Sequence, residues 1–144
     1  KGNTFEFAKF LFTQIQSFGQ KVIIKPLNSY KIYNHAETLI VLTSTYGEGD
    51  PPSNANNFVS RFYKFKQPNK INYSIIGFGS LSYPKFCAFA VTVERVIKPI
   101  ENFKEILPLM KINRCSVVEF NKWIEMWNNS EISTIKFKPM QVDI

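Results

Sequence analysis

The chain has 144 residues, of which 44% are hydrophobic and 15% aromatic. This length suits one domain with a sizeable core, and the composition excludes a disordered chain. A net charge of +7 attracts polyanions, but the Lys and Arg residues are scattered and form no nucleic-acid motif, so no nucleic-acid partner is expected. No apolar run reaches the roughly 18 residues of a membrane span, so this fragment is not expected to insert into a membrane.

The two cysteines give no sign of a metal site or a disulfide framework. Cys87 and Cys115 lie far apart and have no Cys/His partner at metal-ligand spacing. A reducing compartment is therefore expected, which predicts a cytoplasmic domain. The single histidine, His35, lies in a polar stretch, and no residue is predicted to act as a general acid or nucleophile.

The first half of the chain predicts one helix and two strands. Apolar residues at helical spacing predict a helix from Thr4 to about Ser17, with Thr4 as its N-cap and Gly19 closing it. The apolar run before Pro26 predicts a short strand over 21–26. A loop with one helical turn is expected over 28–37, before a buried strand from Thr38 to Thr43.

The second half repeats this alternation. Ser53 is the expected N-cap of the next helix, and the apolar run over 73–78 predicts a second buried strand. Pro84 is expected in the first turn of a further helix. A weak strand over 103–109 is limited by Pro108, and Ser116 and Glu119 form a capping-box pattern before a last helix.

Alternating strands and helices predict a doubly wound parallel α/β sheet. Four strands are expected within the sequence, and a fifth, the first of the sheet, is expected before Lys1. Residues 2–4 would then form its loop into the first helix. Three loops would meet at the carboxyl edge of the sheet, namely 1–4, 43–52 and 77–83, which is where open α/β sheets bind ligands.

These loops suit a phosphate and a flat ring. Backbone N–H groups at the start of a helix bind anions, and Tyr46 and Tyr83 could stack on the two faces of a heterocycle. The alternative for each loop is structural. A Gly-Glu-Gly-Asp-Pro-Pro segment alone is typical of a surface turn, and Tyr83 before Pro84 could simply cap a helix and bury its ring.

Two motifs resemble the flavodoxin-like FMN domains of diflavin reductases. These are Ser44-Thr45-Tyr46-Gly47-Glu48-Gly49-Asp50-Pro51-Pro52 and Gly77-Phe78-Gly79-Ser80 with Tyr83-Pro84. The family includes the reductase regions of nitric oxide synthases, sulfite reductase flavoproteins and NADPH-dependent cytochrome reductases. The exact residues of these motifs also resemble the flavodoxin-like part of bacterial membrane-attached reductases of the PepSY type. The resemblance covers about residues 2–127 and implies a sheet order of 2-1-3-4-5.

The resemblance also implies FMN as cofactor and a role for each matching residue. Tyr46 and Tyr83 would flank the flavin ring, and the Gly47 carbonyl would lie near flavin N5. The remaining implied contacts, to the phosphate, the ribityl chain or the ring edge, fall on Gly2, Asn3, Thr4, Ser44, Thr45, Glu48, Gly49, Gly79 and Ser80.

The implied activity is one-electron transfer within an NAD(P)H-dependent diflavin oxidoreductase. Residues 1–128 would be the FMN domain, and residues 129–144 a linker or strand leading to a domain that binds FAD and NADPH or NADH. That reductase domain, in the same or another chain, would be one partner, and a redox acceptor protein or small molecule the other. The domain could also face the cytoplasm from a membrane-attached protein.

Alternatives to this function are a stand-alone flavodoxin, a quinone reductase, or a flavin-free interaction module of the same fold. One stretch departs from the family. An acidic loop is usual before the last helix, whereas this chain has Lys111-Ile112-Asn113-Arg114-Cys115. Together with the positive net charge, this departure argues against the usual acidic docking face.

Overall fold

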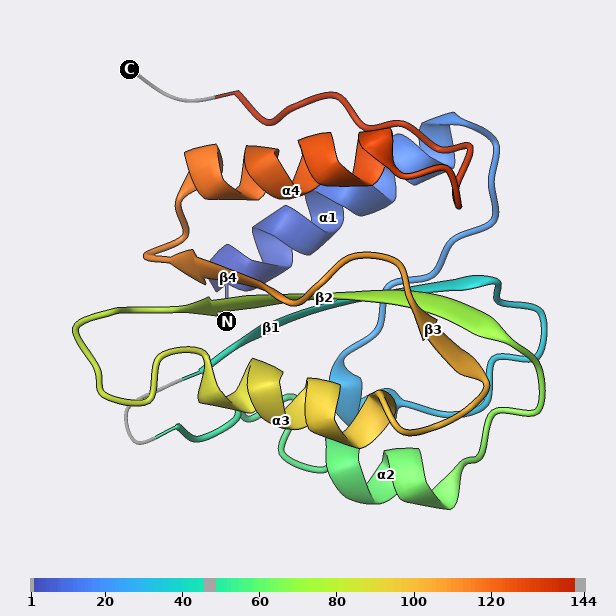
Figure 1. Cartoon of the computed structure of the whole chain (residues 1–144), viewed down its shortest axis with the longest axis horizontal. Coiled ribbons are helices and arrows are strands. Elements are labelled where there is room, and N and C mark those ends of the chain that lie inside the picture. Colours follow the sequence, from blue (N-terminus) through green and yellow to red (C-terminus); the bar gives the residue numbers. More distant parts are fainter. Residues whose placement is uncertain (1, 46–48, 142–144) are drawn as a thin grey trace.

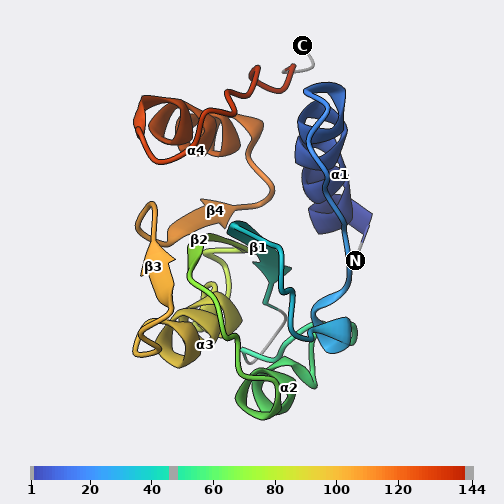
Figure 2. The same cartoon turned by 90° about the vertical axis from the view of Figure 1, so that its right-hand side faces the viewer.

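The computed structural model describes residues 2–45 and 49–141, which form a three-layer α/β arrangement. Helices α1 and α4 cover one face of a parallel sheet, and α2 and α3 cover the other (Figures 1 and 2). The elements are α1 (Gly2–Ser17), a 3-10 turn (Leu27–Ser29), β1 (Thr38–Ser44), α2 (Phe58–Lys64), β2 (Ile71–Gly79), α3 (Ala88–Ile97), β3 (Phe103–Glu105), β4 (Met110–Asn113) and α4 (Val117–Asn129).

Strand β2 is the centre of the sheet. It pairs in parallel with β1 from Thr38↔Asn72 to Ser44↔Phe78, and β3 and β4 also pair with it in parallel. The carboxyl ends of β1, β2 and β4 therefore lie at one edge, on the left of Figure 1. The predicted doubly wound α/β class is confirmed, and the order β1-β2-β3 matches the last three positions of the predicted sheet.

The two faces of β2 bury different clusters. Tyr73 and Ile75 pack with α2 and α3, while Ile76 and Phe78 pack with α1 and α4. On the second face Trp123 is fully buried, and its Nε1 donates to Ser74 Oγ at 2.9 Å. The periodicity of α4 predicts this role, because Trp123 and Trp127 fall at helical spacing and both are core residues.

The prediction of a strand over 21–26 is wrong. This segment belongs to no strand or helix, and Ile23 is exposed. A strand needs a hydrogen-bonded neighbour, and within the described ranges β1 pairs only with β2. The apolar run is therefore insufficient on its own to form an assigned strand.

The last predicted strand is divided in two. Strand β3 pairs Phe103 with Ile71, whereas β4 pairs Met110 with Ile76, so two extra residues lie between the paired stretches. Pro108 falls in this interruption and has no N–H to offer to the sheet.

Three predicted helix starts are wrong by two residues or more. Helix α1 already begins at Gly2, so Thr4 lies in its first turn and is not the N-cap. Helix α2 begins at Phe58 and not after Ser53, because Asn28 holds the preceding turn through bonds to the Ser53 carbonyl and the Asn57 N–H. Helix α3 begins at Ala88 and not at Pro84, because Cys87 has a left-handed backbone, with φ of 55°.

Half of the predicted capping box of α4 is confirmed. Ser116 Oγ accepts from the Glu119 N–H at 3.1 Å, as an N-cap should. The Glu119 carboxylate does not accept from the Ser116 N–H, as a full capping box requires. Its Oε1 accepts instead from the Asn113 N–H at 2.8 Å. Glu119 thus ties the start of α4 to the end of β4.

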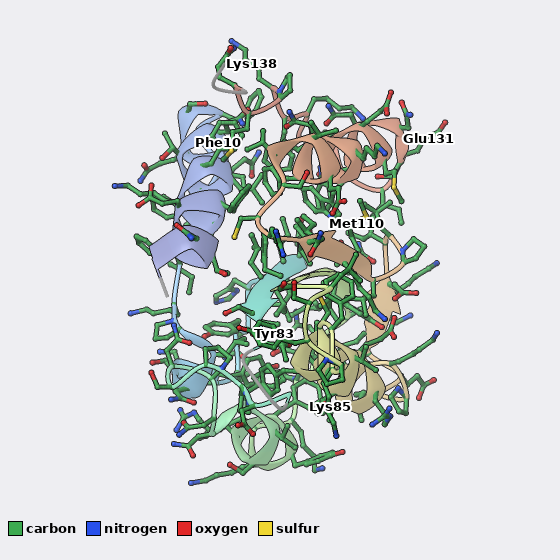
Figure 3. The ribbon with its side chains drawn as sticks, turned by 90° about the vertical axis from the view of Figure 1, so that its left-hand side faces the viewer. Phe10, Tyr83, Lys85, Met110, Glu131 and Lys138 are labelled. Carbon is green, nitrogen blue, oxygen red and sulfur yellow. The ribbon has the colours of Figure 1, made fainter. Side chains whose placement is uncertain are left out.

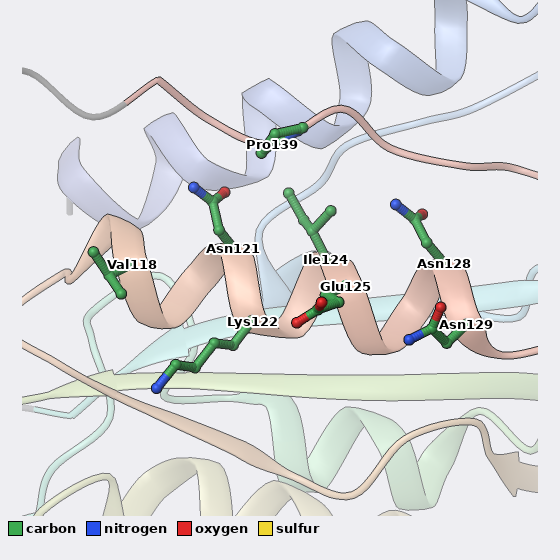
Figure 4. A pocket seen from close by; sticks show the side chains of 8 residues that line it. All are labelled: Val118, Asn121, Lys122, Ile124, Glu125, Asn128, Asn129 and Pro139. Carbon is green, nitrogen blue, oxygen red and sulfur yellow. The ribbon is translucent and has the colours of Figure 1, made fainter.

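The described tail, residues 131–141, lies along the layer formed by α1 and α4 (Figure 2). Three side-chain amides each make paired hydrogen bonds to one tail residue: Gln14 to Lys138, Asn128 to Phe137 and Asn121 to Met140. Asn121 and Asn128 point from α4 toward the segment that carries Pro139 (Figure 4). The tail is therefore packed onto the domain although no strand is assigned within it.

Replacing Asn128 with alanine should loosen this tail. The change removes two bonds to Phe137, of 2.8 and 2.9 Å, so we expect a loss of about 1–3 kcal/mol in the free energy of unfolding. Hydrogen exchange at the Phe137 amide should accelerate. Asn129→Ala is the matched control, since Asn129 is exposed and adjacent on α4. Equal urea midpoints for the two variants would contradict the prediction.

Candidate functional site

Three segments meet at the carboxyl edge of the sheet: the first turn of α1, the loop after β1 and the loop after β2. Figure 3 looks onto this edge, with Tyr83 and Lys85 labelled. Gly2, Asn3 and Thr4 are helical and do not form the predicted loop. The prediction of anion binding is compatible with this change, because N–H groups in a first helical turn have no partner within the helix.

The end of β1 carries two buried hydroxyls. Thr43 Oγ1 and Ser44 Oγ have no hydrogen-bond partner among the described residues, although the two side chains are 2% and 8% exposed. They point to opposite faces because side chains alternate along a strand. Ser44 shares a face with Leu42, on the side of α1, and Thr43 shares a face with Val41, on the side of α3. Burying a hydroxyl without a hydrogen-bond partner costs free energy unless another group, such as a ligand, forms a hydrogen bond with it.

The loop after β1 is fastened to its neighbours on both sides. The Thr45 N–H donates to the Phe78 carbonyl at 3.0 Å, and Thr45 Oγ1 accepts from the Phe89 N–H at 2.9 Å. Gly49 has φ of 98°, and a Cβ there would lie 3.0 Å from Lys85 Cδ. Three further predicted site residues, Tyr46, Gly47 and Glu48, lie outside the described residues.

The loop after β2 presents Tyr83 at the surface. The Tyr83 ring is exposed, and its N–H donates to the Ser80 carbonyl at 3.1 Å. Gly79 is tightly enclosed, since a Cβ there would lie 3.1 Å from the Cys87 backbone nitrogen. Ser80 Oγ accepts from the Ser82 N–H at 3.2 Å. The turn is therefore compact, and Tyr83 is not buried as the structural alternative required.

The loop between β4 and α4 also joins this edge, which the sequence did not predict. Asn113 Oδ1 accepts from the Leu81 N–H at 2.8 Å, and Arg114 Nη2 donates to Ser82 Oγ at 2.7 Å. The Arg114 N–H donates to the Gly79 carbonyl at 2.7 Å. The available signal was the polar pair Asn113-Arg114 directly after an apolar strand, where a parallel sheet places further edge loops.

Cys87 lies directly behind Gly79 and is fully buried. Burial raises the pKa of its thiol to about 11. The thiol of the unfolded chain ionises at lower pH than the buried thiol. The stability that the buried, neutral Cys87 contributes is therefore complete below about pH 9 and is lost as pH rises toward 11.

We expect Cys87 to account for about 1 kcal/mol of the stability lost between pH 8 and pH 10. Urea unfolding of Cys87→Ala should show a correspondingly smaller loss over this interval than the wild type. The pKa values of Tyr30 and Tyr73 are raised by burial to about 12, so their contribution is common to both proteins. An identical pH response would refute the prediction.

Two surface hollows of the described residues lie away from this edge. One, of about 460 Å³, runs along α4 beside Pro139 (Figure 4), and the other, of about 260 Å³, lies against α2. Within residues 2–45 and 49–141 there is no group of three or more metal-ligating side chains. In the same ranges no helix is both long and apolar enough to cross a membrane.

The chain is similar to nitric oxide synthases in sequence. It is 34% identical to the inducible enzyme of Homo sapiens over 80 residues, which cover 55% of this chain and 7% of the relative. It is 35% identical to that of Carassius auratus over 74 residues, covering 51% of this chain and 45% of the relative. The chain thus spans less than half the length of these relatives.

Solved flavodoxins share the fold. A mutant flavodoxin from Pseudomonas aeruginosa matches with a TM-score of 0.67 and 21% identity, over 88% of this chain and 86% of that one. A flavodoxin from Streptococcus pneumoniae TIGR4 matches with a TM-score of 0.65 and 23% identity, over 78% of each chain. The family model described as flavodoxin matches residues 1–127. The chain therefore belongs to the flavodoxin family.

Proposed function

We propose that this domain binds FMN at the carboxyl edge of the sheet and carries electrons one at a time. The observation that supports this most directly is the end of β1. Thr43 and Ser44 have buried hydroxyls without a partner among the described residues, at the end of the strand from which the β1 loop leaves, with Ser44 on the side of α1. Membership of the flavodoxin family implies FMN, and these polar groups fit it.

The residues that would hold FMN divide into two groups. The phosphate would be bound by the first turn of α1, with Asn3 and Thr4, and by Ser44 on the same side of the sheet. The ring would be flanked by Tyr83 and by Tyr46, with the Gly47 carbonyl and the Glu48–Gly49 backbone at its edge. When bound, FMN supplies the one-electron chemistry, while the chain binds and orients the ring.

The similarity to nitric oxide synthases supports a proposal for the partners. We propose that a domain carrying FAD and NADPH or NADH, in the same or another chain, supplies the electrons, and that residues 129–144 lead toward it. A redox protein or small molecule would accept them. The similarity to nitric oxide synthases supports this assignment over a stand-alone flavodoxin or quinone reductase. Cys87 and Cys115 are both free, in keeping with a cytoplasmic location.

A titration with FMN tests the proposal. We expect the purified protein to quench the fluorescence of added FMN, with a dissociation constant raised about 2- to 12-fold in Tyr83→Ala, because one stacking contact is lost. Tyr63→Ala is the matched control, since Tyr63 is 53% exposed and Tyr83 55%, but Tyr63 lies on α2.

The possible outcomes separate the alternatives. A protein that neither carries flavin nor responds to added FMN would exclude the proposal and leave the flavin-free interaction module. Equal weakening in both tyrosine variants would exclude Tyr83 as a ring contact. Direct reduction of quinones by the domain with NADPH alone would favour a quinone reductase.

A further inference from the structure

The turn between β4 and α4 holds the loop that carries Tyr83. Two side chains reach across: Asn113 Oδ1 accepts from the Leu81 N–H, and Arg114 Nη2 donates to Ser82 Oγ. These contacts fall on the two residues immediately before Tyr83. Glu119 in turn holds the Asn113 N–H, so the network continues into the first turn of α4.

The backbone of this turn is strained. Arg114 and Cys115 have φ of 52° and 54°, and the Ser116 N–H donates to the Asn113 carbonyl at 3.1 Å. Two consecutive positive φ angles closed by this bond are typical of a type I′ turn, in which Gly and Asn are the favoured central residues. A non-glycine residue in this region is unfavourable and persists only where surrounding contacts fix it.

The turn also brings positive charge to the edge of the sheet. Arg114 is exposed at this end of β4, and Lys111 is exposed on the same strand. Lys85 packs against Gly49 in the loop after β1. The neighbouring Glu119 carboxylate is engaged by the Asn113 N–H and not by Arg114. Among the described residues, Asp50 is the acidic residue of the loop after β1, and it is exposed.

We propose that Arg114 is a positioning residue of the flavin site that also sets the preference for reduced flavin. Its bond to Ser82 holds the 80–83 turn so that Tyr83 is in place before the cofactor arrives. Its fixed positive charge favours the two-electron-reduced ring, which is an anion once it has lost a proton. This inference rests on the proposed FMN site, and its positioning half is measurable without any flavin.

The positioning half is tested by hydrogen exchange on the flavin-free protein. In Arg114→Gln and Ser82→Ala we expect exchange at the Leu81–Tyr83 amides to accelerate about 3- to 10-fold, because a bond across the loops is lost. Arg95→Gln is the matched control: it removes the same charge, but from the last turn of α3, far along that helix from the edge. Wild-type exchange in both loop variants would overturn the positioning role.

The charge half is tested by comparing the affinities for oxidised and reduced FMN. Arg114→Gln should lower the affinity for reduced FMN about 3- to 10-fold more than that for oxidised FMN. A tenfold change in this ratio moves the two-electron midpoint potential down by about 30 mV. The shift should shrink at 1 M salt, because the guanidinium is exposed.

Two further variants separate charge from position. Ser82→Ala keeps the charge, so it should weaken both forms of FMN equally and leave the midpoint potential unchanged. Arg114→Lys should keep most of the wild-type potential. A potential in Arg114→Gln equal to the wild type would overturn the charge role. A wild-type protein that binds no FMN would overturn it together with the proposed function, while the exchange result would still decide the positioning role.

Discussion

Replacing Trp123 with alanine is expected to remove a large part of the stability of the domain. The side chain is fully buried between α4 and the sheet, in ring contact with Phe120, Trp127 and Phe137. Removing a buried aromatic ring costs about 3–5 kcal/mol, and such domains are stable by only about 5–15 kcal/mol. Urea unfolding measures the loss directly.

A cycle of variants separates packing from hydrogen bonding at this position. Trp123→Phe keeps a ring but leaves the buried Ser74 hydroxyl without the indole N–H, so it should cost about 1–3 kcal/mol beyond the volume change. Adding Ser74→Ala should recover part of that cost. Met126→Ala, a partly exposed position on the same helix, is the control. Strict additivity of the Ser74 and Trp123 changes would disprove the coupling.

Gly77→Ala is the second change with a large expected effect. Gly77 lies in the middle of the sheet on β2, and a Cβ there would come within 2.5 Å of Ala90 Cβ on α3. Real Cβ atoms do not approach so closely, so α3 must move away from the sheet. We expect a cost of about 1–3 kcal/mol from overpacking, measured by thermal or urea unfolding. Because α3 follows the loop that carries Tyr83, weaker FMN binding should accompany the loss.

A compensating change makes this prediction specific. Ala90→Gly alone should cost about 1 kcal/mol, because glycine is unfavourable within a helix. In the double variant the clash is absent, so its stability should exceed that expected from adding the two single effects. If the two costs simply add, contact between these residues is not what requires glycine at position 77.

The elements that could be predicted from the sequence are those whose local pattern coincides with their burial. Strands β1 and β2 each contain a buried apolar run and lie in the sheet with helices on both faces, as such runs require. The segment over 21–26 has the same local pattern but no neighbour within the described ranges. Whether a segment pairs with another strand is not encoded in that segment alone. The local pattern therefore predicted a strand that does not form.

Helix starts were harder to predict because backbone angles decided them. Nothing in the residue type of Cys87 indicates a left-handed conformation, yet that angle delays α3 from Pro84 to Ala88. Asn28 similarly holds the turn before α2 from a distance of 25 residues or more in sequence. Contacts of this kind become visible only when the chain is folded.

The candidate site was predicted in part for the same reason. Ser44 and Gly79 end β1 and β2, and Tyr83 follows β2, so their presence at one edge of the sheet is a consequence of topology. Arg114 meets Ser82 across 32 residues of sequence, and its role depends on a turn with two positive φ angles. The resemblance to known FMN domains identified the loops but not this contact, because the acidic loop usual in those domains is replaced here.

The paired amide contacts along the tail have a consequence for which substitutions the tail can accept. Gln14, Asn121 and Asn128 bind backbone atoms, so the side chains of Lys138 and Met140 can vary while the path of the tail persists. Proline is another matter, because the N–H groups of Phe137, Lys138 and Met140 all donate. Pro139 occupies the position between them where no amide proton is required. Moving this proline by one residue in either direction should release the tail, although composition and length would be unchanged.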